Sequence, residues 1–249
     1  MSLGLTVDEV LMTTRAVRRR LDFDRPVPEA VLRDCLELAL QAPTAALRQD
    51  WHFVISTDPE QCEAVGKIYQ ESWRVVNYLL RLGWTPSSPT NIARVPQPDT
   101  GVALPDRLDG LEQARFAHTD GHDDAMSQGW RSQMSAAVHL SENFPRVPAI
   151  LIPCIQGRMD GAFADLQAVR WGSVIQATWS FCLAARDRGL GTCWTTTHLD
   201  RERAVADVLG IPYDEIQQVA LLPVAYTLGT DFGPATRKPL EEVVHFNGW

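Results

Sequence analysis

The 249-residue chain lacks the sequence signatures of the most common catalytic and nucleotide-binding sites. It contains no G-x-G-x-x-G run, no Walker phosphate loop, no H-E-x-x-H pair and no G-x-S-x-G nucleophile turn. The sequence therefore does not indicate a Rossmann dinucleotide site, a P-loop, a zincin-type metal centre or a serine-hydrolase elbow. What remains is chemistry that a bound cofactor would bring with it.

Long apolar runs and paired cysteines are also missing. A membrane-spanning helix needs ~20 apolar residues in a row, and the chain has no such run. It also lacks a charged N-terminal region followed by an apolar core, the pattern of a signal peptide. The five cysteines are scattered, with no C-x-x-C pair, which is typical of free thiols in a reducing compartment. We therefore expect a cytoplasmic protein with no membrane partner.

Positive charge is in deficit over the whole chain. Lysine and arginine number 23 against 31 acidic residues, which gives a formal net charge of −8. A chain with this balance is repelled by a phosphate backbone, so we expect no nucleic-acid partner. The hydrophobic content of 45% and charged content of 22% are those of an ordinary globular protein.

One basic segment, residues 13–20 (TTRAVRRR), stands out in this acidic chain. The T-x-x-E pattern that starts at Thr6 is a capping box, so we expect a helix that begins there and ends in the basic segment. On a helix, Arg15, Arg18 and Arg19 would share one face, where like charges repel unless an anion lies against them. Two interpretations stay open at this point, a solvated basic face and a phosphate site built from guanidinium groups.

Apolar periodicity and turn residues predict alternating helices and strands. The expected later helices span residues 27–42, 59–82, 165–188 and 200–209. The expected strands span residues 51–57, 147–155, 192–197 and 217–226. Pro148 and Pro153 predict that the strand over 147–155 lies at a sheet edge or contains a bulge. This alternation indicates an α/β or α+β class with a layered sheet.

Residues 84–134 differ in composition from the rest of the chain. Prolines break regular structure in the first half, and the stretch 111–140 is predicted to be mostly helical. Because no second core stands on either side, we expect a single domain, 1–249, with 84–134 as an insertion or lid. His118 and His122 have the i,i+4 spacing of metal ligands. The intervening Gly121 and polar neighbours favour a solvated turn instead.

The predicted helix over 165–188 is apolar on most of its circumference and should be central. It also carries a stripe of small or polar residues, namely Ser173, Gln176, Ala177, Ser180 and Ala184. Such a stripe permits close approach of another helix. That helix could belong to a second subunit or to the same chain.

Several blocks of sequence occur in a characteristic order: a basic R-x-x-R segment, RPVPEAVLRDCLELALQAPT, a glutamine before an aromatic strand, RGLGTCW and RKPLEEVVH. This order resembles the FMN-dependent nitroreductase family over nearly the whole chain, most specifically over residues 25–58. The resemblance implies an α+β, nitroreductase-like layered α/β/α fold with a central, mostly antiparallel sheet. It also implies a homodimer with FMN at the subunit interface.

The activity that the resemblance implies is that of an NAD(P)H-dependent FMN oxidoreductase. NADH or NADPH would reduce the flavin, which would then reduce a nitroaromatic, a quinone or a related small-molecule acceptor by ping-pong hydride transfer. No side chain is then needed as the catalyst, and no metal is expected. Two alternatives stay open. One is a specialised flavoenzyme of the same family, such as a dehalogenase, flavin destructase or enoyl-type reductase, and the other is a non-catalytic flavin-binding protein.

The resemblance further implies a set of cofactor-binding residues. They are Thr14, Arg15, Ala16, Arg18, Pro43, Thr44, Ala45, Leu47, Gln49, Thr195, Thr196, Thr197 and Arg237. In this mapping Arg15 and Arg237 lie near the flavin phosphate, and Arg18 lies near the pyrimidine edge. The backbone of 195–197 lies along the ring.

Three of these positions depart from the family pattern. Thr14 stands where a first arginine is common, Ala16 stands where serine is common, and Leu47 replaces an asparagine in the A-P-S-x-x-N-x-Q loop. Ala16 and Leu47 each remove a polar group from the expected flavin contacts, whereas Thr14 retains a hydroxyl.

Overall fold

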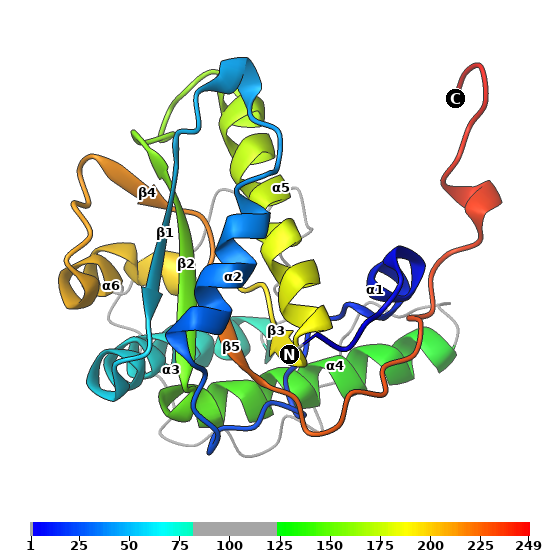
Figure 1. Cartoon of the computed structure of the whole chain (residues 1–249), viewed down its shortest axis with the longest axis horizontal. Helices are drawn as coiled ribbons and strands as arrows, with labels where there is room; N and C mark the ends of the chain where they lie inside the picture. The colour runs from blue at the N-terminus through cyan, green and yellow to red at the C-terminus, as the bar shows by residue number, and fades with distance from the viewer. Residues whose placement is uncertain (1, 82–123) are drawn as a thin grey trace.

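The structure is a computed structural model that describes residues 2–81 and 124–249 (Figure 1). The α-helices of these residues are α1 (Val7–Thr13), α2 (Glu29–Ala39), α3 (Pro59–Arg81), α4 (Asp124–Asn143), α5 (Ala164–Asp187) and α6 (Glu202–Leu209). The strands are β1 (Trp51–Ser56), β2 (Ala149–Gln156), β3 (Leu190–Thr192), β4 (Ile216–Gln218) and β5 (Leu222–Tyr226). Short 3-10 turns are η1 (Ala45–Leu47), η3 (Phe144–Arg146), η4 (Thr197–Arg201) and η5 (Leu240–Glu242). In the described part of the chain, the helices are too short or too polar to cross a bilayer.

The strands form one sheet in the order β1-β2-β5-β3, and β4 also pairs with β2. Every ladder between these strands is antiparallel. The expected central antiparallel sheet is therefore confirmed.

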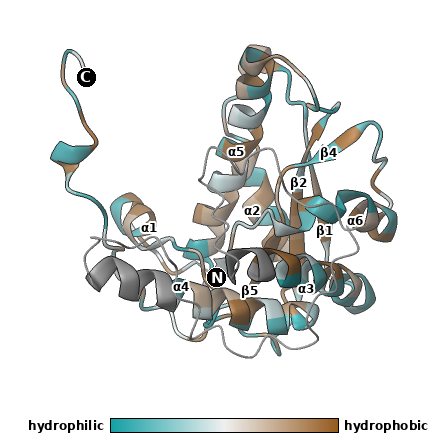
Figure 2. Ribbon diagram, turned by 180° about the vertical axis from the view of Figure 1, so that it is seen from behind, coloured by the Kyte–Doolittle hydropathy of each residue, from teal (hydrophilic) through white to brown (hydrophobic). Residues whose placement is uncertain are grey.

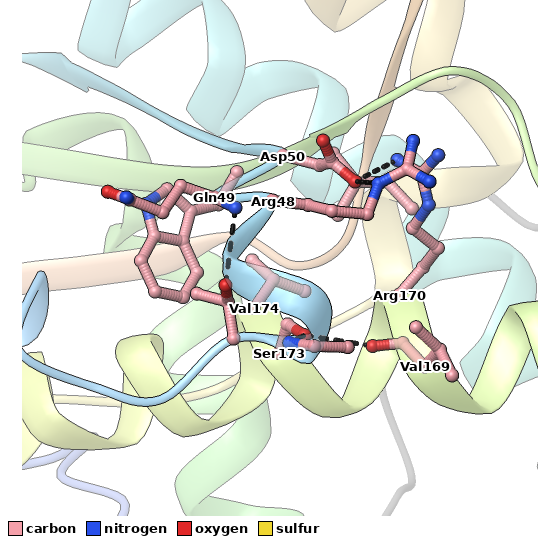
Figure 3. A pocket seen from close by; sticks show the side chains of 11 residues that line it. Arg48, Gln49, Asp50, Val169, Arg170, Ser173 and Val174 are labelled. Carbon is pink, nitrogen blue, oxygen red and sulfur yellow. Dashed lines mark hydrogen bonds and ion pairs between the residues drawn. The ribbon is translucent and has the colours of Figure 1, made fainter.

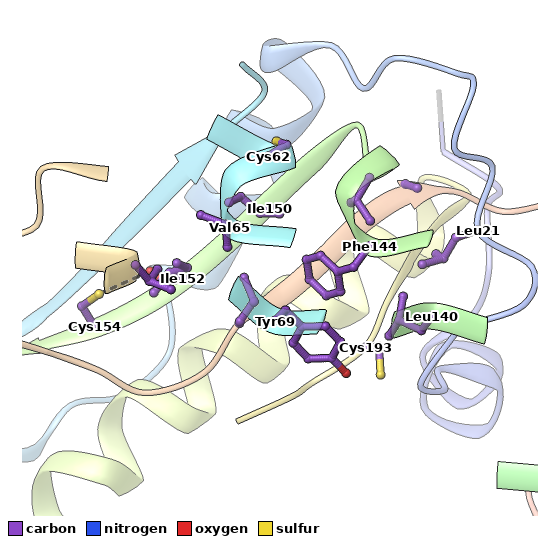
Figure 4. Close-up of a cluster of buried hydrophobic side chains, with 14 of the residues drawn as sticks. Leu21, Cys62, Val65, Tyr69, Leu140, Phe144, Ile150, Ile152, Cys154 and Cys193 are labelled. Atoms are coloured by element: carbon purple, nitrogen blue, oxygen red, sulfur yellow. Dashed lines mark hydrogen bonds between the residues drawn. The ribbon is translucent and has the colours of Figure 1, made fainter. Parts of the chain in front are cut away.

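Helices cover both faces of this sheet. The side chains of β2 alternate between the two faces and pack against the helices on each. Ala149 and Leu151 pack with buried residues of α2 and α5. Ile150, Ile152 and Cys154 point the other way and pack with α3 and α6 (Figure 4). Hydrophobic residues accordingly line the strands, while hydrophilic ones mark the outer sides of α3 and α6 (Figure 2). The result is the expected α/β/α layering.

The proline-containing strand was predicted to lie at an edge or to contain a bulge, and the edge is wrong. The register of pairing instead shifts by one residue between its ladders with β5 and β4, which is the irregularity that a bulge introduces. β2 lies inside the sheet, between β1 on one side and β4 and β5 on the other. Its pairing with β5 ends at Leu151, and its pairing with β4 begins at Cys154. Pro153 lies in the gap between these two ladders, where its carbonyl accepts a bond from the N–H of Val219 at 2.9 Å. Since neither ladder on that side requires an N–H at that point, a central strand tolerates proline there.

The capping box at Thr6 is confirmed, with Thr6 and Glu9 bonded reciprocally, but the helix ends earlier than predicted. α1 stops at Thr13, and Thr14 is extended. The hydroxyls of Thr13 and Thr14 donate to the carbonyls of Glu9 and Val10, each at 2.6 Å. These bonds occupy carbonyls of the last turn, and the chain then leaves to join the sheet.

Two predicted strands are also corrected. The strand expected over 192–197 is instead β3, only three residues long and ending at Thr192. Residues 217–226 form two strands, β4 and β5, because β2 pairs with each in turn. The helix expected over 200–209 begins as the turn η4 and continues as α6, which ends at Gly210 in the left-handed region (φ 66°).

Most of the predicted insertion, including His118 and His122, lies outside the described residues. Its last part, residues 124–134, belongs to α4. At the end of that stretch, Met134 packs with Trp73 of α3. The lid assignment and the single-domain boundary therefore stay predictions.

Gly66 provides a test of the packing between α3 and η3. A Cβ at this position would lie 2.5 Å from the Cα of Pro145 and 2.8 Å from the carbonyl carbon of Phe144. Because backbone cannot yield as a flexible side chain does, we expect Gly66→Ala to lower the free energy of unfolding by about 1–3 kcal/mol. Urea unfolding measures this change. Lys67→Ala, at the neighbouring exposed position, is the control and should cost under about 0.5 kcal/mol. Equal stability of the two variants would contradict this close approach of α3 to η3.

Candidate functional site

The N-terminal basic segment reaches the predicted site through backbone pairing with the sheet. Ala16 forms a parallel bridge with Thr192, and the N–H of Val17 donates to the Thr192 carbonyl at 2.8 Å. Val17 is buried in the core below α3. The segment therefore runs alongside the end of β3, just before the predicted residues 195–197.

The arginines of this segment do not share a helical face, so that expectation is wrong. Arg15 donates to the Gly233 carbonyl at 3.0 Å, and Arg19 donates to the Ser135 hydroxyl. Arg20 forms an ion pair with Asp231 at 2.7 Å. Because the chain is extended here, the guanidinium groups point to different partners and their mutual repulsion is relieved.

Arg18 lies beside Cys193, next to the predicted flavin-facing segment. Burial raises the pKa of the Cys193 thiol, and the Arg18 guanidinium opposes the shift. Tyr69 of α3 reaches the same place. Burial raises the pKa of Tyr69 to about 12. The nearby Thr195 and Thr197 hydroxyls and the charge of Arg18 each lower this pKa, but by less. Both the thiol and the phenol are therefore neutral at physiological pH.

The segment 195–197 has one backbone N–H without an acceptor among the described residues. The N–H and carbonyl of Thr195 are both bonded to Leu221, at 3.1 and 2.8 Å. The N–H of Thr197 faces the Thr195 hydroxyl at 3.4 Å. Among the residues that the structure describes, the N–H of Thr196 has no acceptor, and Thr196 is exposed. A ligand at this surface would meet that N–H first.

A set of arginines holds the C-terminal segment 228–233 against α1. Arg20 donates to the Leu228 carbonyl at 2.9 Å and Arg186 donates to the Thr230 carbonyl at 3.0 Å. Arg186 is only 6% exposed, and within the described structure its Nη1 has no hydrogen-bonding partner. Burial lowers the pKa of Arg186, and Asp187 opposes this shift.

Arg237, the predicted second phosphate ligand, lies beyond this segment. It is exposed, and its side chain donates to the neighbouring Thr236 carbonyl at 3.0 Å. The tail that carries it leads away from the sheet (Figure 1). The structure does not bring Arg237 together with Arg15.

The second group of predicted residues lies in the loop after α2. The Ala45 N–H donates to the hydroxyl of Ser173 on α5 at 3.2 Å, and the Gln49 N–H donates to the Thr44 hydroxyl at 3.3 Å. The predicted Pro43 is exposed and leads into this loop. A pocket here is lined in part by Thr44, Ala45 and Gln49 together with Arg170 and Ser173 of α5 (Figure 3).

This loop carries backbone strain and a projecting apolar side chain. Ala46, Leu47 and Gln49 have φ values of 52°, 56° and 49°, a region that residues other than glycine rarely adopt. Leu47 is 84% exposed. Strain of this kind, at ~1–3 kcal/mol per residue, is concentrated at ligand sites and switches.

The two groups of predicted site residues contact α5 at well-separated positions. The loop contacts Ser173, whereas the N-terminal segment reaches Arg186, whose Nε donates to the Thr13 hydroxyl at 3.2 Å. Thirteen residues separate Ser173 from Arg186, about 20 Å along a helix at 1.5 Å per residue. One chain therefore does not gather all the predicted residues around one small volume.

A buried polar network adjoins residues 195–197 from behind. Glu202 pairs with Arg158 at 2.8 Å and accepts the Gln218 N–H at 2.8 Å. His198 is fully buried, and neither of its ring nitrogens has a well-aligned partner among the described groups. Burial lowers the pKa of His198 to about 3, which the nearby Gln218 side chain offsets only in part.

Sequence reasoning missed Tyr69 and Arg186 as neighbours of the site. Tyr69 fits the apolar stripe of α3, and Arg186 lies in a helix that is otherwise largely apolar. Neither residue belongs to a motif, and only the fold brings them close to residues 13–18 and 195–197.

An antiparallel sheet between helical layers defines an α+β protein, and its basic N-terminal segment pairs with the end of β3. The chain belongs to the nitroreductase family, whose family model matches residues 11–226. The match includes every predicted site residue except Arg237.

One protein is similar to this chain in sequence, and two solved structures are similar to it in fold. The chain is 26% identical over 212 residues to a 4-nitrobenzoate reductase of Nocardioides sp. (strain LMS-CY), covering 82% of this chain and 74% of the relative. The FMN and NADPH-dependent nitroreductase NfnB from Sphigopyxis sp. strain HMH has a TM-score of 0.63 at 20% identity, over 98% of this chain and all of that one. A BluB-like flavoprotein from Clostridium difficile 630 has a TM-score of 0.60 at 15% identity, over 98% and 99% of the two chains.

His198 predicts a loss of stability in mild acid. Its folded pKa of about 3 lies below the unfolded value of about 6.5. Between these values the unfolded chain binds a proton that the folded protein excludes, so stability falls as the pH drops below about 6.5. We expect a loss of roughly 2 kcal/mol by pH 5, measured by urea unfolding across pH.

The variant His198→Gln should lose this component of the pH dependence, whatever its stability at neutral pH. The matched control is His52→Gln, at an exposed position on β1, which should keep it. Identical pH slopes for His198→Gln and the unmodified protein would show that His198 is not buried in its neutral form.

Proposed function

We propose that this chain is an FMN-dependent oxidoreductase that uses NADH or NADPH to reduce a nitroaromatic, a quinone or a related small-molecule acceptor. The observation that carries the proposal is that the basic segment with Arg15 and Arg18 pairs with the end of β3, shortly before Thr196 and its available N–H. Arg15 and Arg18 form no ion pair with a carboxylate among the described residues. Cationic donors without counter-ions suit an anionic, hydrogen-bonding cofactor such as FMN.

The charges support a specific division of roles. Arg15 would bind the phosphate, with Arg237 as a second ligand once the tail is ordered against it. Arg18 would face the N1 and C2 carbonyl edge, where a guanidinium stabilises the negative charge of reduced flavin. The aliphatic Ala16 leaves room for the ring but contributes no hydroxyl.

Backbone geometry supports Thr196 as the donor to flavin N5. The neighbouring Thr195 and Thr197 amides already face acceptors within the chain, so within the described structure Thr196 has the donor with no such acceptor. A Thr196 N–H that donates to flavin N5 would orient the ring without adding a charge. No general base is required of the chain, because the bound flavin would take hydride directly from NAD(P)H and pass two electrons to the acceptor.

The position of the loop 43–49 supports a homodimer in which the second copy completes the site. The loop contacts α5 at Ser173, far along the helix from the N-terminal segment that carries Arg15, and its strained backbone presents Leu47 to solvent. The exposed face of α5 is also apolar, with Val169, Ile175 and Trp179 each more than 40% exposed. We propose that this face packs against a second copy, whose Pro43, Thr44, Ala45, Leu47 and Gln49 approach the flavin.

The direct test is the cofactor content and reactivity of the purified protein. We expect flavin absorption bands, about one FMN per chain released on heating, and bleaching when NADH or NADPH is added without oxygen. A nitroaromatic or quinone should then restore the yellow colour. A colourless protein that takes up no added FMN contradicts the proposal, and a yellow protein that neither nucleotide bleaches supports a flavin-binding protein without turnover.

The phosphate role of Arg15 is tested by comparing FMN with riboflavin, which lacks the phosphate. Arg15→Ala should weaken FMN binding about 10- to 100-fold, as expected for loss of a charge-assisted bond, and leave riboflavin binding nearly unchanged. Arg19→Ala, in the same basic segment, should leave both affinities within about twofold of their original values. An equal loss for both flavins would assign Arg15 to the fold or to the ring and not to the phosphate.

A further inference from the structure

The loop 43–49 is attached to one face of α5 at both of its ends. At its start, the Ala45 N–H donates to the Ser173 hydroxyl at 3.2 Å. Directly after its end, the Asp50 carboxylate forms an ion pair with Arg170 at 2.7 Å. Positions 170 and 173 are three residues apart in α5, which places them next to each other on one helix face. The two attachments therefore hold the loop from the same side.

Asp50 is the junction between the loop, the sheet and α5. Its carboxylate oxygen Oδ2 is shared by the guanidinium groups of Arg170 and Arg48, at 2.7 and 2.8 Å (Figure 3). Its backbone carbonyl accepts the Gln156 N–H at 2.7 Å, and Arg170 donates to the Gln156 carbonyl at 3.0 Å. The side chains of Arg170 and Asp50 are only 13% and 22% exposed, so solvent screens this pair less than it screens a fully exposed one.

Between these attachments the loop holds a conformation that its own side chains do little to stabilise. Ala46, Leu47 and Gln49 all have positive φ values, and the side chains of Leu47 and Gln49 are exposed. Strained backbone of this kind persists only where the surrounding structure over-determines it. The bonds that reach α5 at Ser173 and Arg170 supply that constraint.

We propose that Arg170 is a positioning residue for the flavin site. Through its ion pair with Asp50 it holds the loop 43–49 in the strained conformation that presents Leu47 and Gln49 to the flavin of a second copy. This inference rests on the proposed FMN function and extends it to two residues, Arg170 and Asp50, that would not touch the cofactor. Because positioning errors of about 1 Å can cost about 100-fold in rate, loosening this loop should be measurable at the flavin.

The first test is the flavin affinity of Arg170→Met, which removes the charge and keeps an apolar stem. We expect the Kd of FMN to rise about tenfold, as for loss of one hydrogen bond to a charged group. The Kd of riboflavin should rise by the same factor, because Leu47 and Gln49 carry no charge with which to bind the phosphate. Since one nitrogen, Nη1, makes both bonds of Arg170, the ammonium group of Arg170→Lys can replace it, and this variant should stay within about threefold of the unmodified protein.

Arg203→Met is the matched control. It makes the same change at an ion pair with Asp214 in which both side chains are exposed, and it should leave both affinities within about twofold of their original values. In a double-mutant cycle, Arg170→Met should have little further effect once Asp50→Asn has removed the partner charge.

A stricter test combines two altered chains in one dimer, purified through different tags on an Arg15→Ala chain and an Arg170→Met chain. If each site takes its arginines from one copy and its loop from the other, one site carries both changes and the other carries neither. About half of the flavin sites in this mixed dimer should therefore bind FMN as tightly as the unmodified protein does. A general folding defect of the Arg170→Met chain would not allow this recovery, because that chain supplies Arg15 and Arg18 to the restored site.

Cleavage by trypsin after Arg48 gives a readout that needs no flavin. In the apoprotein, Arg170→Met should raise the rate of this cleavage about tenfold, because opening of the loop no longer breaks the ion pair to α5. The peptide that starts at Gln49, identified by its mass, measures the reaction, and Arg203→Met should leave its rate unchanged. Equal cleavage of Arg170→Met and the unmodified protein would show that Arg170 does not hold the loop.

The outcomes separate this inference from the proposed function. If the unmodified protein binds and reduces FMN but Arg170→Met matches it in affinity, the positioning role is overturned and the proposed function stands. A mixed dimer without a tight site would also overturn it, as would additive effects of Arg170→Met and Asp50→Asn. If the unmodified protein takes up no FMN, the proposed function fails and the flavin role of Arg170 fails with it.

Discussion

The hydrogen bond from the Val17 N–H to the Thr192 carbonyl is the interaction on which the candidate site depends. It draws an extended N-terminal segment onto the end of β3 and buries Val17, so the arginines on either side are held at a defined place. Had the helix continued, Arg15 and Arg18 would have faced the same solvent. The side-chain bonds of Thr13 and Thr14 to the last turn allow this exit.

Hydrogen bonding to backbone carbonyls, more than ion pairing, then ties the two ends of the chain together. Arg15, Arg20 and Arg186 donate to carbonyls of the segment 228–233, and Arg20 alone of these three pairs with a carboxylate there. Charges that remain uncompensated in this way, one of them buried, are costly unless an anion offsets them. This group of arginines contrasts with the formal net charge of −8 of the whole chain.

Local signals in the sequence predicted what local forces decide. The capping box at Thr6 and the layered class are confirmed because side-chain periodicity and capping act over a few residues, whereas the antiparallel sheet was implied by the resemblance to the nitroreductase family. The predicted end of α1 and the edge alternative for the strand of Pro153 were wrong, since each depends on partners distant in the sequence. The place of Tyr69 near residues 193–197 could not be read from its apolar stripe, because that depends on how α3 packs against η4. The individual flavin contacts stay predictions.

The length of α5 has a consequence for how tolerant this architecture is to change. The loop at Ser173 and the arginine at position 186 take their relative direction from the same continuous helix. Inserting or deleting one residue between them would turn one end by about 100° relative to the other and shift it by about 1.5 Å. In a symmetric pair of chains that error would appear at both interfaces at once.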